Sequence, residues 1–229
     1  MLLFRALTMQ VHENNLFWIQ ENFPELHHRV VNKTHFFEGL FCFCGSFSEE
    51  LKEYTFFLGG VMVGEVCDAY KVRIEIYSDK LPVIYETGGR IPFSTDYHKY
   101  GNGSVCAWGV LDWPESVAEV FDLALQFFFD QSYFQRHQKW PRGEYYHGEL
   151  GLLQNYYQAT LRGIRSEELC MKLLRQSLEA KYINSILVKR KIKGHHPCIC
   201  GSTDHFRRCH PDVFKGMWLL QKHFQAKGV

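Results

Sequence analysis

Hydrophobic and polar residues follow two different periods along the first half of the chain. Residues 11–22 place apolar side chains at the three- and four-residue spacing of a helix, which stops before Pro24. Residues 70–77 alternate strictly instead, and this period is typical of a half-buried strand. Apolar runs predict three further strands, at residues 40–47, 54–63 and 81–85. The pattern predicts a helix followed by a four-stranded antiparallel meander with one covered face.

Residues 87–114 break this pattern, because they are rich in Gly, Pro, Asn and Asp with only single apolar residues between them. A long loop without periodicity inside a compact domain is usually functional. After this loop, apolar residues again recur at helical spacing. We expect one helix after Pro114 and two more over residues 149–161 and 166–187. The basic stretch 189–194 is interpreted as a linker. The whole order predicts an α+β protein.

The composition is that of an ordinary globular chain. A 46% hydrophobic content in 229 residues excludes wholesale disorder, and eight cysteines are too few for a disulfide scaffold. No apolar run approaches the roughly 18 uncharged residues that a membrane span needs. The first residues carry an Arg within their short apolar stretch and no small-residue cleavage pattern. We therefore expect a soluble cytoplasmic protein with no membrane partner and with reduced cysteines.

The charge is distributed unevenly along the chain. Residues 1–159 carry 12 Lys/Arg and 20 Asp/Glu (12 − 20 = −8), whereas residues 160–229 carry 14 and 5 (14 − 5 = +9). Such a split favours two functional surfaces, although basic residues on solvated helix faces are the simpler interpretation. Nucleic acid is the less favoured partner, because the basic residues are spread over predicted helices with few aromatic residues between them.

One cysteine, Cys106, lies in the polar part of the long loop, eight positions after His98. A thiol in such a setting is more accessible than one on an apolar strand, and reaction as a nucleophile requires the thiolate. The alternative is that Cys106 serves as a small buried hydrophobic residue.

The segment around Cys106 resembles the active-site segment of ubiquitin-conjugating enzymes. In that family a helix and a four-stranded meander lead into a loop with an Asn-Gly-Ser-aliphatic-Cys sequence, followed by a Trp-containing turn and a helix. Here Asn102 begins that sequence, Cys106 ends it, and Trp113 and Pro114 follow. The resemblance covers roughly residues 10–160. It implies a ubiquitin-conjugating-enzyme-like fold in which Cys106 is the catalytic residue and Asn102 an active-site neighbour.

One departure from the family concerns the His-Pro-Asn triplet that usually precedes the cysteine. Asp96, Tyr97 and His98 occupy its place here, so that His98 stands where the family has Asn. An imidazole can donate a hydrogen bond to an oxyanion and can accept a proton near neutral pH. His98 is therefore the second candidate for a catalytic residue, and the alternative is that it only fixes the loop.

Divergent bacterial members of this fold occur in antiviral operons of the CBASS type, where they conjugate the C-terminus of a cGAS/DncV-like nucleotidyltransferase to a target. Residues 140–148 also resemble a segment that follows the core helix in these relatives, which makes His147 a possible active-site neighbour. The alternative is that this segment supplies packing aromatics and turn glycines.

The resemblance implies a transferase in antiphage defence. Cys106 would carry a donor protein C-terminus as a thioester, from a ubiquitin-like protein or a nucleotidyltransferase, and pass it to a lysine of an acceptor protein. An activating enzyme is a further expected partner. Two alternatives stay open: an inactive adaptor with the same fold, and a cysteine hydrolase that uses Cys106 with His98 or His147.

A second motif, near the C-terminus, has the spacing of metal ligands. Two cysteines one residue apart are followed, after eight residues, by an adjacent Cys-His pair; these are Cys198, Cys200, Cys209 and His210. Four such ligands predict a closed tetrahedral zinc site, which is structural because it leaves no position for water. The pattern resembles the short SEC-C zinc motif. The nearby histidines that compete as ligands are interpreted as solvated loop residues; they are His195, His196 and His205.

The other cysteines are expected to be structural. Cys42 and Cys44 alternate with phenylalanines as in a strand, Cys67 has no paired motif, and Cys170 follows a helical apolar pattern. The sequence thus predicts three parts: a catalytic domain at residues 1–160, a basic helical extension at 161–193 and a zinc-binding module at 194–229.

Overall fold

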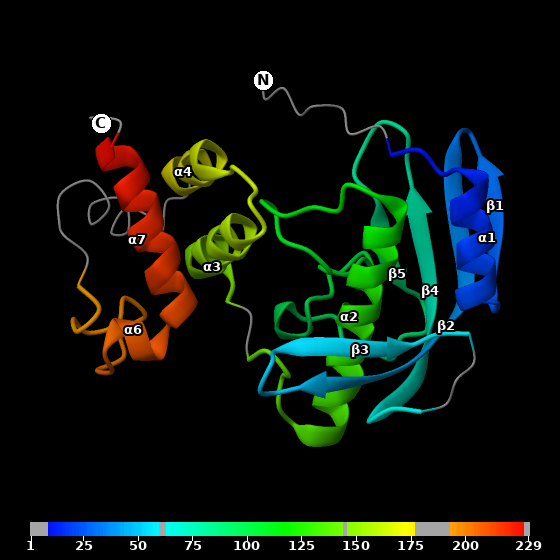
Figure 1. Cartoon of the computed structure of the whole chain (residues 1–229), viewed down its shortest axis with the longest axis horizontal. Coiled ribbons are helices and arrows are strands. Elements are labelled where there is room, and N and C mark those ends of the chain that lie inside the picture. The colour runs from blue at the N-terminus through cyan, green and yellow to red at the C-terminus, as the bar shows by residue number, and fades with distance from the viewer. Residues whose placement is uncertain (1–8, 60–62, 144–145, 177–192, 227–229) are drawn as a thin grey trace. The chain divides into compact units, whose positions relative to one another are not determined.

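The computed structural model describes residues 9–59, 63–143, 146–176 and 193–226 (Figure 1). The chain forms two compact units. Unit 1 comprises Met1–Trp108 and Pro114–Glu144, and unit 2 comprises Gly109–Trp113 and Tyr145–Val229. Unit 2 thus includes a short segment of the long loop as well as the C-terminal part of the chain.

Unit 1 begins with helix α1 (Glu13–Asn22), and the chain then forms a five-stranded antiparallel sheet. The strands are β1 (Leu26–Val31), β2 (Thr34–Ser48), β3 (Glu53–Phe57), β4 (Val66–Ile76) and β5 (Val83–Glu86). They pair in the order β1-β2-β4-β5, while β3 pairs with the second half of β2. The N-terminal helix, the antiparallel sheet and the later helices confirm the predicted α+β class.

Two details of the predicted meander are wrong. The prediction does not include strand β1. Only Leu26 of this edge strand is buried, so the sequence has no alternating apolar pattern there. The second predicted strand, which corresponds to β3, does not lie between β2 and β4 as a meander requires. Strand β4 pairs directly with β2 over eleven residue pairs, and β3 forms a hairpin with β2 along the opposite edge of that strand. The alternation within β4 is confirmed: Val72, Ile74 and Ile76 are at most 2% exposed.

Helix α2 (Val117–His137) covers the apolar face of this sheet (Figure 1). Ser116 caps it by accepting a hydrogen bond from the Glu119 N–H, as expected for a helix that begins behind Pro114. The Phe128 ring lies 4.8 Å from Tyr70 and 5.6 Å from Phe41, measured between centroids. This aromatic packing holds α2 against strands β2 and β4.

Asp130 is a buried acid within α2. Its Oδ1 accepts a 2.7 Å hydrogen bond from the Tyr54 hydroxyl, and Arg142 lies 3.6 Å from Oδ2. Burial raises the pKa of Asp130 to about 6, against the opposing effect of Arg142 and Tyr54. A carboxyl with a raised pKa stabilises the fold most below its unfolded-state value, and this contribution is lost as the pH rises through 6.

We therefore expect Asp130→Asn to gain stability relative to the wild type as the pH rises. The difference in free energy of unfolding between the two proteins should shift by about 1–1.5 kcal/mol in favour of the variant between pH 5 and pH 7.5. Urea unfolding at both pH values measures this shift. Asp79→Asn, at an exposed position, is the control; an Asp130→Asn difference that is independent of pH would contradict the assignment.

The cysteines of β2 and β4 differ from the prediction. Cys44 and Cys67 occupy directly opposed positions on these strands and form a disulfide, so the expectation of reduced cysteines throughout is wrong here. Cys42 is exposed rather than packed in the core, whereas Cys170 is fully buried as predicted. Sequence spacing missed the disulfide because strand register, not distance along the chain, brings its two residues together.

Unit 2 is helical, with α3 (Gly148–Leu161), α4 (Glu167–Gln176), α6 (Phe206–Cys209) and α7 (Pro211–Ala226). Helices α3 and α7 approach closely, since a Cβ on Gly216 would lie 2.2 Å from the Leu153 carbonyl oxygen. The predicted domain boundary at residue 160 falls at the end of α3, which packs with α7 in unit 2. The rest of the predicted helix, residues 177–187, and most of the predicted linker lie outside the described residues.

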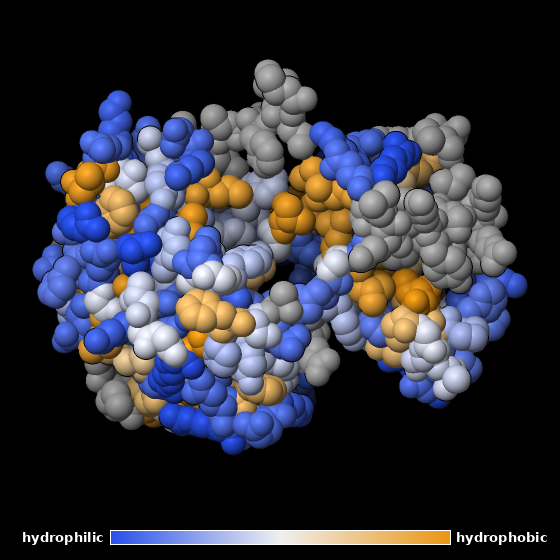
Figure 2. Space-filling model, turned by 180° about the vertical axis from the view of Figure 1, so that it is seen from behind, coloured by the Kyte–Doolittle hydropathy of each residue, from blue (hydrophilic) through white to orange (hydrophobic). Residues whose placement is uncertain are grey.

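No helix in the described part of the chain is long and apolar enough to cross a bilayer. Individual large apolar side chains such as Phe17 and Phe93 are exposed. On the face that Figure 2 presents, hydrophobic residues of unit 1 occur in small groups among polar ones. Such scattered exposure is normal for a protein surface.

Candidate functional site

The loop around Cys106 folds back along strand β5. The Val105 N–H donates to the Ile84 carbonyl at 2.8 Å, and the Cys106 N–H donates to the His98 carbonyl at the same distance. Lys99 and Val105 form an isolated antiparallel bridge. Residues 98–106 are therefore a short hairpin, which brings the backbone of His98 next to that of Cys106.

The tip of this hairpin is shaped by Asn102. Its side-chain oxygen accepts hydrogen bonds from the Ser104 N–H at 3.0 Å and from the Ser104 hydroxyl at 2.7 Å. Gly103 has φ +86°, in the left-handed region that glycine tolerates. The structure thus places Asn102 in the same loop as Cys106, with its amide oxygen engaged in the turn.

The Cys106 thiol is half-buried and contacts two polar groups. Its Sγ lies 3.4 Å from the Trp108 carbonyl oxygen, and it interacts with Tyr100 strongly enough to change the pKa of that phenol. The hydrogen bond to Cys106 and partial burial together raise the pKa of Tyr100 to about 12. The phenol therefore keeps its proton at neutral pH and remains a hydrogen-bond donor beside the sulfur. No spacing rule in the sequence pointed to Tyr100.

A buried ion pair links the hairpin of residues 98–106 to the end of strand β5. The side chains of Lys99 and Glu86 are both fully buried and paired with each other. Lys99 Nζ also donates to the Ile91 carbonyl at 3.0 Å, and a Glu86 oxygen accepts from the Arg90 N–H at 3.2 Å. Lys99 lies between His98 and Tyr100 in the sequence. Its ion pair with Glu86, the last residue of β5, therefore holds the backbone of both residues close to this strand. This pair was not predicted, because a single lysine in a polar loop is usually solvated.

The two predicted histidines occupy different units. His98 has φ +53° and is half-buried, and its carbonyl accepts the hydrogen bond from Cys106. His147 is the exposed N-cap residue of α3 in unit 2. A catalytic role for His98 and a place for His147 near the thiol stay predictions.

The second site is the Cys/His group of unit 2. Side-chain ligand atoms of all four predicted residues lie within 4.8 Å of one another; they are Cys198, Cys200, Cys209 and His210. The Cys200 and Cys209 sulfurs are 3.8 Å apart, which equals the edge of about 3.8 Å expected for two thiolates at about 2.3 Å from a tetrahedral zinc ion. This donor set could bind a metal such as zinc.

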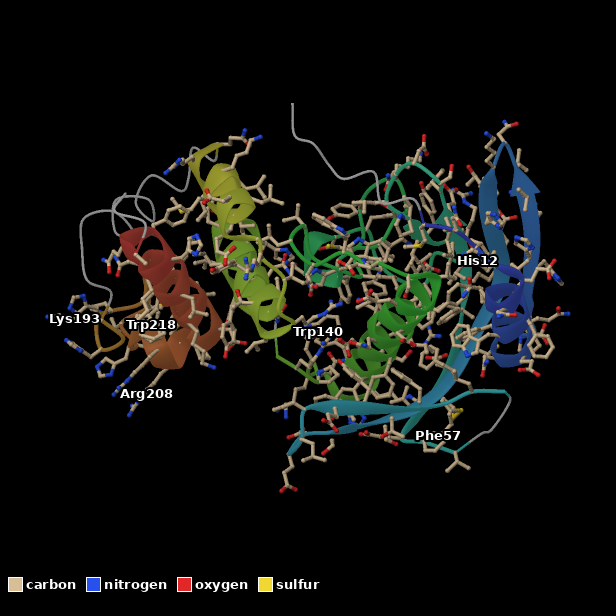
Figure 3. All side chains as sticks on the ribbon, turned by 45° about the horizontal axis from the view of Figure 1, so that its top comes forward. His12, Phe57, Trp140, Lys193, Arg208 and Trp218 are labelled. Carbon is tan, nitrogen blue, oxygen red and sulfur yellow. A yellow bond between two sulfur atoms is a disulfide. The ribbon has the colours of Figure 1, made fainter. Side chains whose placement is uncertain are left out.

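The backbone around the four ligands forms a compact loop. The Cys198 N–H donates to the Asp204 carbonyl at 2.9 Å, and Gly201, with φ +89°, closes the turn after Cys200. Figure 3 shows the side chains of Lys193 and Arg208 extending from this part of unit 2. The three competing histidines are exposed and lie outside the ligand group; they are His195, His196 and His205.

The two sites suit different chemistry. Cys106 offers a partly accessible sulfur in a polar loop, and a thiolate at such a position can act as a nucleophile. The Cys/His group offers four soft ligands without an obvious place for a reacting molecule, which is typical of a structural metal site. Comparisons of the chain with family models, with curated proteins and with solved structures find no match.

Proposed function

We propose that this protein is a ubiquitin-conjugating-like transferase that carries a protein C-terminus as a thioester on Cys106. The observation that carries the proposal is the half-buried Cys106 thiol, held in the loop between β5 and α2 by the hydrogen bond from its N–H to the His98 carbonyl. The order of helix, antiparallel sheet, cysteine loop and helix supports it further.

The reaction we propose has two steps. The Cys106 thiolate attacks the carbonyl carbon of an activated C-terminus, so that a C–S bond forms and the adenylate or the supplying thiol leaves. A lysine amine of the acceptor then attacks the thioester carbon, a C–N bond forms, and the C–S bond breaks to return the thiolate. The amine proton passes to a base, for which His98 is the candidate, or to water. Tyr100 donates a hydrogen bond to the charge that develops beside the sulfur.

The donor in this proposal is a protein with a flexible C-terminal tail: a ubiquitin-like protein or a cGAS/DncV-like nucleotidyltransferase. The acceptor presents a lysine, an activating enzyme supplies the acyl group, and the biological setting is antiphage defence. The Cys198, Cys200, Cys209 and His210 group holds a structural zinc ion in this proposal, because a closed set of four ligands leaves no open coordination position.

Loss of the Tyr100 hydroxyl is expected to slow the reaction with little effect on the fold. Tyr100→Phe should lower the rate of thioester formation and discharge by about 10–100-fold, because one donor near the developing charge is removed. The free energy of unfolding should change by less than about 1 kcal/mol, since the side chain is 53% exposed. Single-turnover discharge to free lysine measures the rate, and an unchanged rate would remove Tyr100 from the mechanism.

The function is tested with the protein's genomic neighbours. The purified protein is incubated with ATP and with each neighbouring gene product, and adducts are resolved with and without reductant. We expect a reductant-sensitive adduct that is absent in Cys106→Ala and retained in Cys42→Ala, the matched control at an exposed cysteine of the same unit. A reductant-resistant product that weakens in His98→Ala would support the second catalytic assignment.

Two other results would favour the alternatives. Peptide cleavage without any partner, lost in Cys106→Ala, would replace the proposal with a cysteine hydrolase. Stable binding of a neighbour without any covalent adduct would indicate an inactive adaptor.

A further inference from the structure

Two histidines face each other on the hairpin formed by β1 and β2. The Nε2 of His28 lies 3.0 Å from the Nδ1 of His35, and the two rings are nearly parallel with their centroids 5.2 Å apart. In the register of the strands, His28 is opposite Phe37 and His35 is opposite Val30, so the two histidines are diagonal neighbours on one face of the sheet. The His28 side chain is exposed and that of His35 is half-buried.

The backbone holds these two positions in a fixed register. Asn32 and Lys33 form the two-residue turn of the hairpin, with φ +49° and +65°, and positive φ at both positions is typical of the tight turns that join antiparallel strands. On its other side β2 pairs with β4, beginning with His35 opposite Ile76. His35 therefore lies on an interior strand of the sheet, and the short turn fixes β1 relative to it.

Aromatic packing restrains the His28 ring as well. The ring stacks on Phe37, with 4.8 Å between the centroids and an angle of 23° between the planes. Phe37 is 1% exposed and belongs to the core of unit 1, so the surface under His28 is rigid. A side chain restrained in this way loses little conformational entropy when it binds a ligand.

Both rings are available in the form that binds metal ions. A 3.0 Å contact between two ring nitrogens requires a lone pair on at least one of them. Partial burial lowers the pKa of His28 and of His35, and the charge of His35 lowers the pKa of His28 further. Metal ions bind neutral imidazole. When the protons of the two neutral rings lie on His28 Nδ1 and His35 Nε2, both facing nitrogens present lone pairs.

We propose that His28 and His35 form a binding site for a divalent transition-metal ion, with nickel(II) or copper(II) favoured. Imidazole nitrogens bind ions such as zinc at about 2.0–2.1 Å, so two of them at a right angle are about 2.8–3.0 Å apart, whereas a tetrahedral ion separates them by about 3.3–3.4 Å. The observed 3.0 Å agrees with the right angle. Right-angled positions belong to the tetragonal geometry typical of nickel(II) and copper(II).

The bound ion would replace the contact between the two rings and would link the edge strand β1 to β2. Water would complete the coordination, because His28 is exposed. The site uses no residue of the Cys/His group in unit 2, and it is independent of the function proposed for Cys106.

Nickel titration of the full-length protein, loaded with zinc beforehand, tests the site. Paramagnetic Ni²⁺ should broaden the backbone amide signals of β1 and β2 around His28 and His35 at the lowest nickel concentrations. The broadening of these signals gives the Kd of this site separately from nickel bound elsewhere on the chain. The wild-type pattern therefore locates the ion without any substitution.

Two variants each remove one ligand. His28→Phe keeps a ring that can stack on Phe37, and His35→Asn keeps a polar side chain at the half-buried position. Each should raise the Kd measured at β1 and β2 by at least about 10-fold, because only one anchoring nitrogen remains. His27→Phe is the matched control, since His27 is exposed and points to the opposite face of β1. Its Kd should equal that of the wild type.

Each outcome decides the proposal in one direction. Broadening at β1 and β2 that both ligand variants lose and His27→Phe retains would support the site. Nickel bound only elsewhere, for example at His195 and His196 in unit 2, would overturn it, and so would the same Kd in all variants. If one ligand variant does not give a folded amide spectrum, the other variant and the wild-type pattern decide the question.

Discussion

Cys106→Ser is expected to fold normally and to lose transfer by at least about 10³-fold. A serine hydroxyl is almost wholly protonated at neutral pH and is a far weaker nucleophile than a thiolate, so thioester chemistry cannot proceed at its normal rate. Any adduct that does form is an oxyester, which resists reductant and breaks at alkaline pH. Reductant resistance of the remaining adduct therefore identifies the bonding atom directly. The change from sulfur to oxygen is small and the position is only half-buried, so stability should change by less than about 1 kcal/mol.

The matched control for this experiment is Cys42→Ser. Cys42 is exposed and lies in unit 1 as well, but it belongs to strand β2 rather than to the loop. Its variant should form the reductant-sensitive adduct at the wild-type rate. An adduct that remains reductant-sensitive in Cys106→Ser would show that another cysteine carries the acyl group, and the proposal for Cys106 would fail.

Removal of zinc is expected to have the largest effect on stability. Binding free energies of about 10–16 kcal/mol have been assigned to structural zinc in small finger peptides, and most of this energy appears as folding energy. Chelation at neutral pH should therefore unfold the segment that carries the four ligands. Cys198 is both a candidate ligand and a member of the buried core of unit 2, together with Phe206 and Val213, so the loss should extend into α7.

Calorimetry and metal analysis measure this effect together. The purified protein should contain one equivalent of zinc, and chelation should lower the unfolding temperature of unit 2 while the transition of unit 1 stays nearly unchanged. Cys198→Ser should reproduce the effect without chelator, whereas Cys42→Ser should retain the metal. A protein with no bound zinc and with the same unfolding profile before and after chelation would refute a structural metal.

The elements were predictable to the extent that each one carries its own periodic pattern. Helices α1, α2 and α3 and strand β4 have amphipathic or alternating patterns, and all of them form within a few residues of the predicted ranges. Strand β1 does not, because an edge strand with one buried residue has no period to detect. The grouping of the four candidate metal ligands was predictable because they are close in sequence, so that local loop geometry alone can bring them together.

The contacts of Cys106 were less predictable. The sequence identified the thiol and the loop, but Tyr100 and the Glu86–Lys99 pair emerged only from the structure. Each of these contacts depends on how the hairpin of residues 98–106 packs against strand β5. The cross-strand pairing of Cys44 with Cys67 depends in the same way on the register of β2 and β4.

Local sequence by itself therefore determined the periodic elements, the cysteine in a polar loop and the set of candidate metal ligands. These features follow from short-range preferences: side-chain period, turn residues and ligand spacing. Only the tertiary structure decided which groups surround the thiol and that residues 109–113 of the long loop belong to unit 2. Those arrangements arise from burial and hydrogen bonding between residues far apart in the chain, and no spacing rule encodes them.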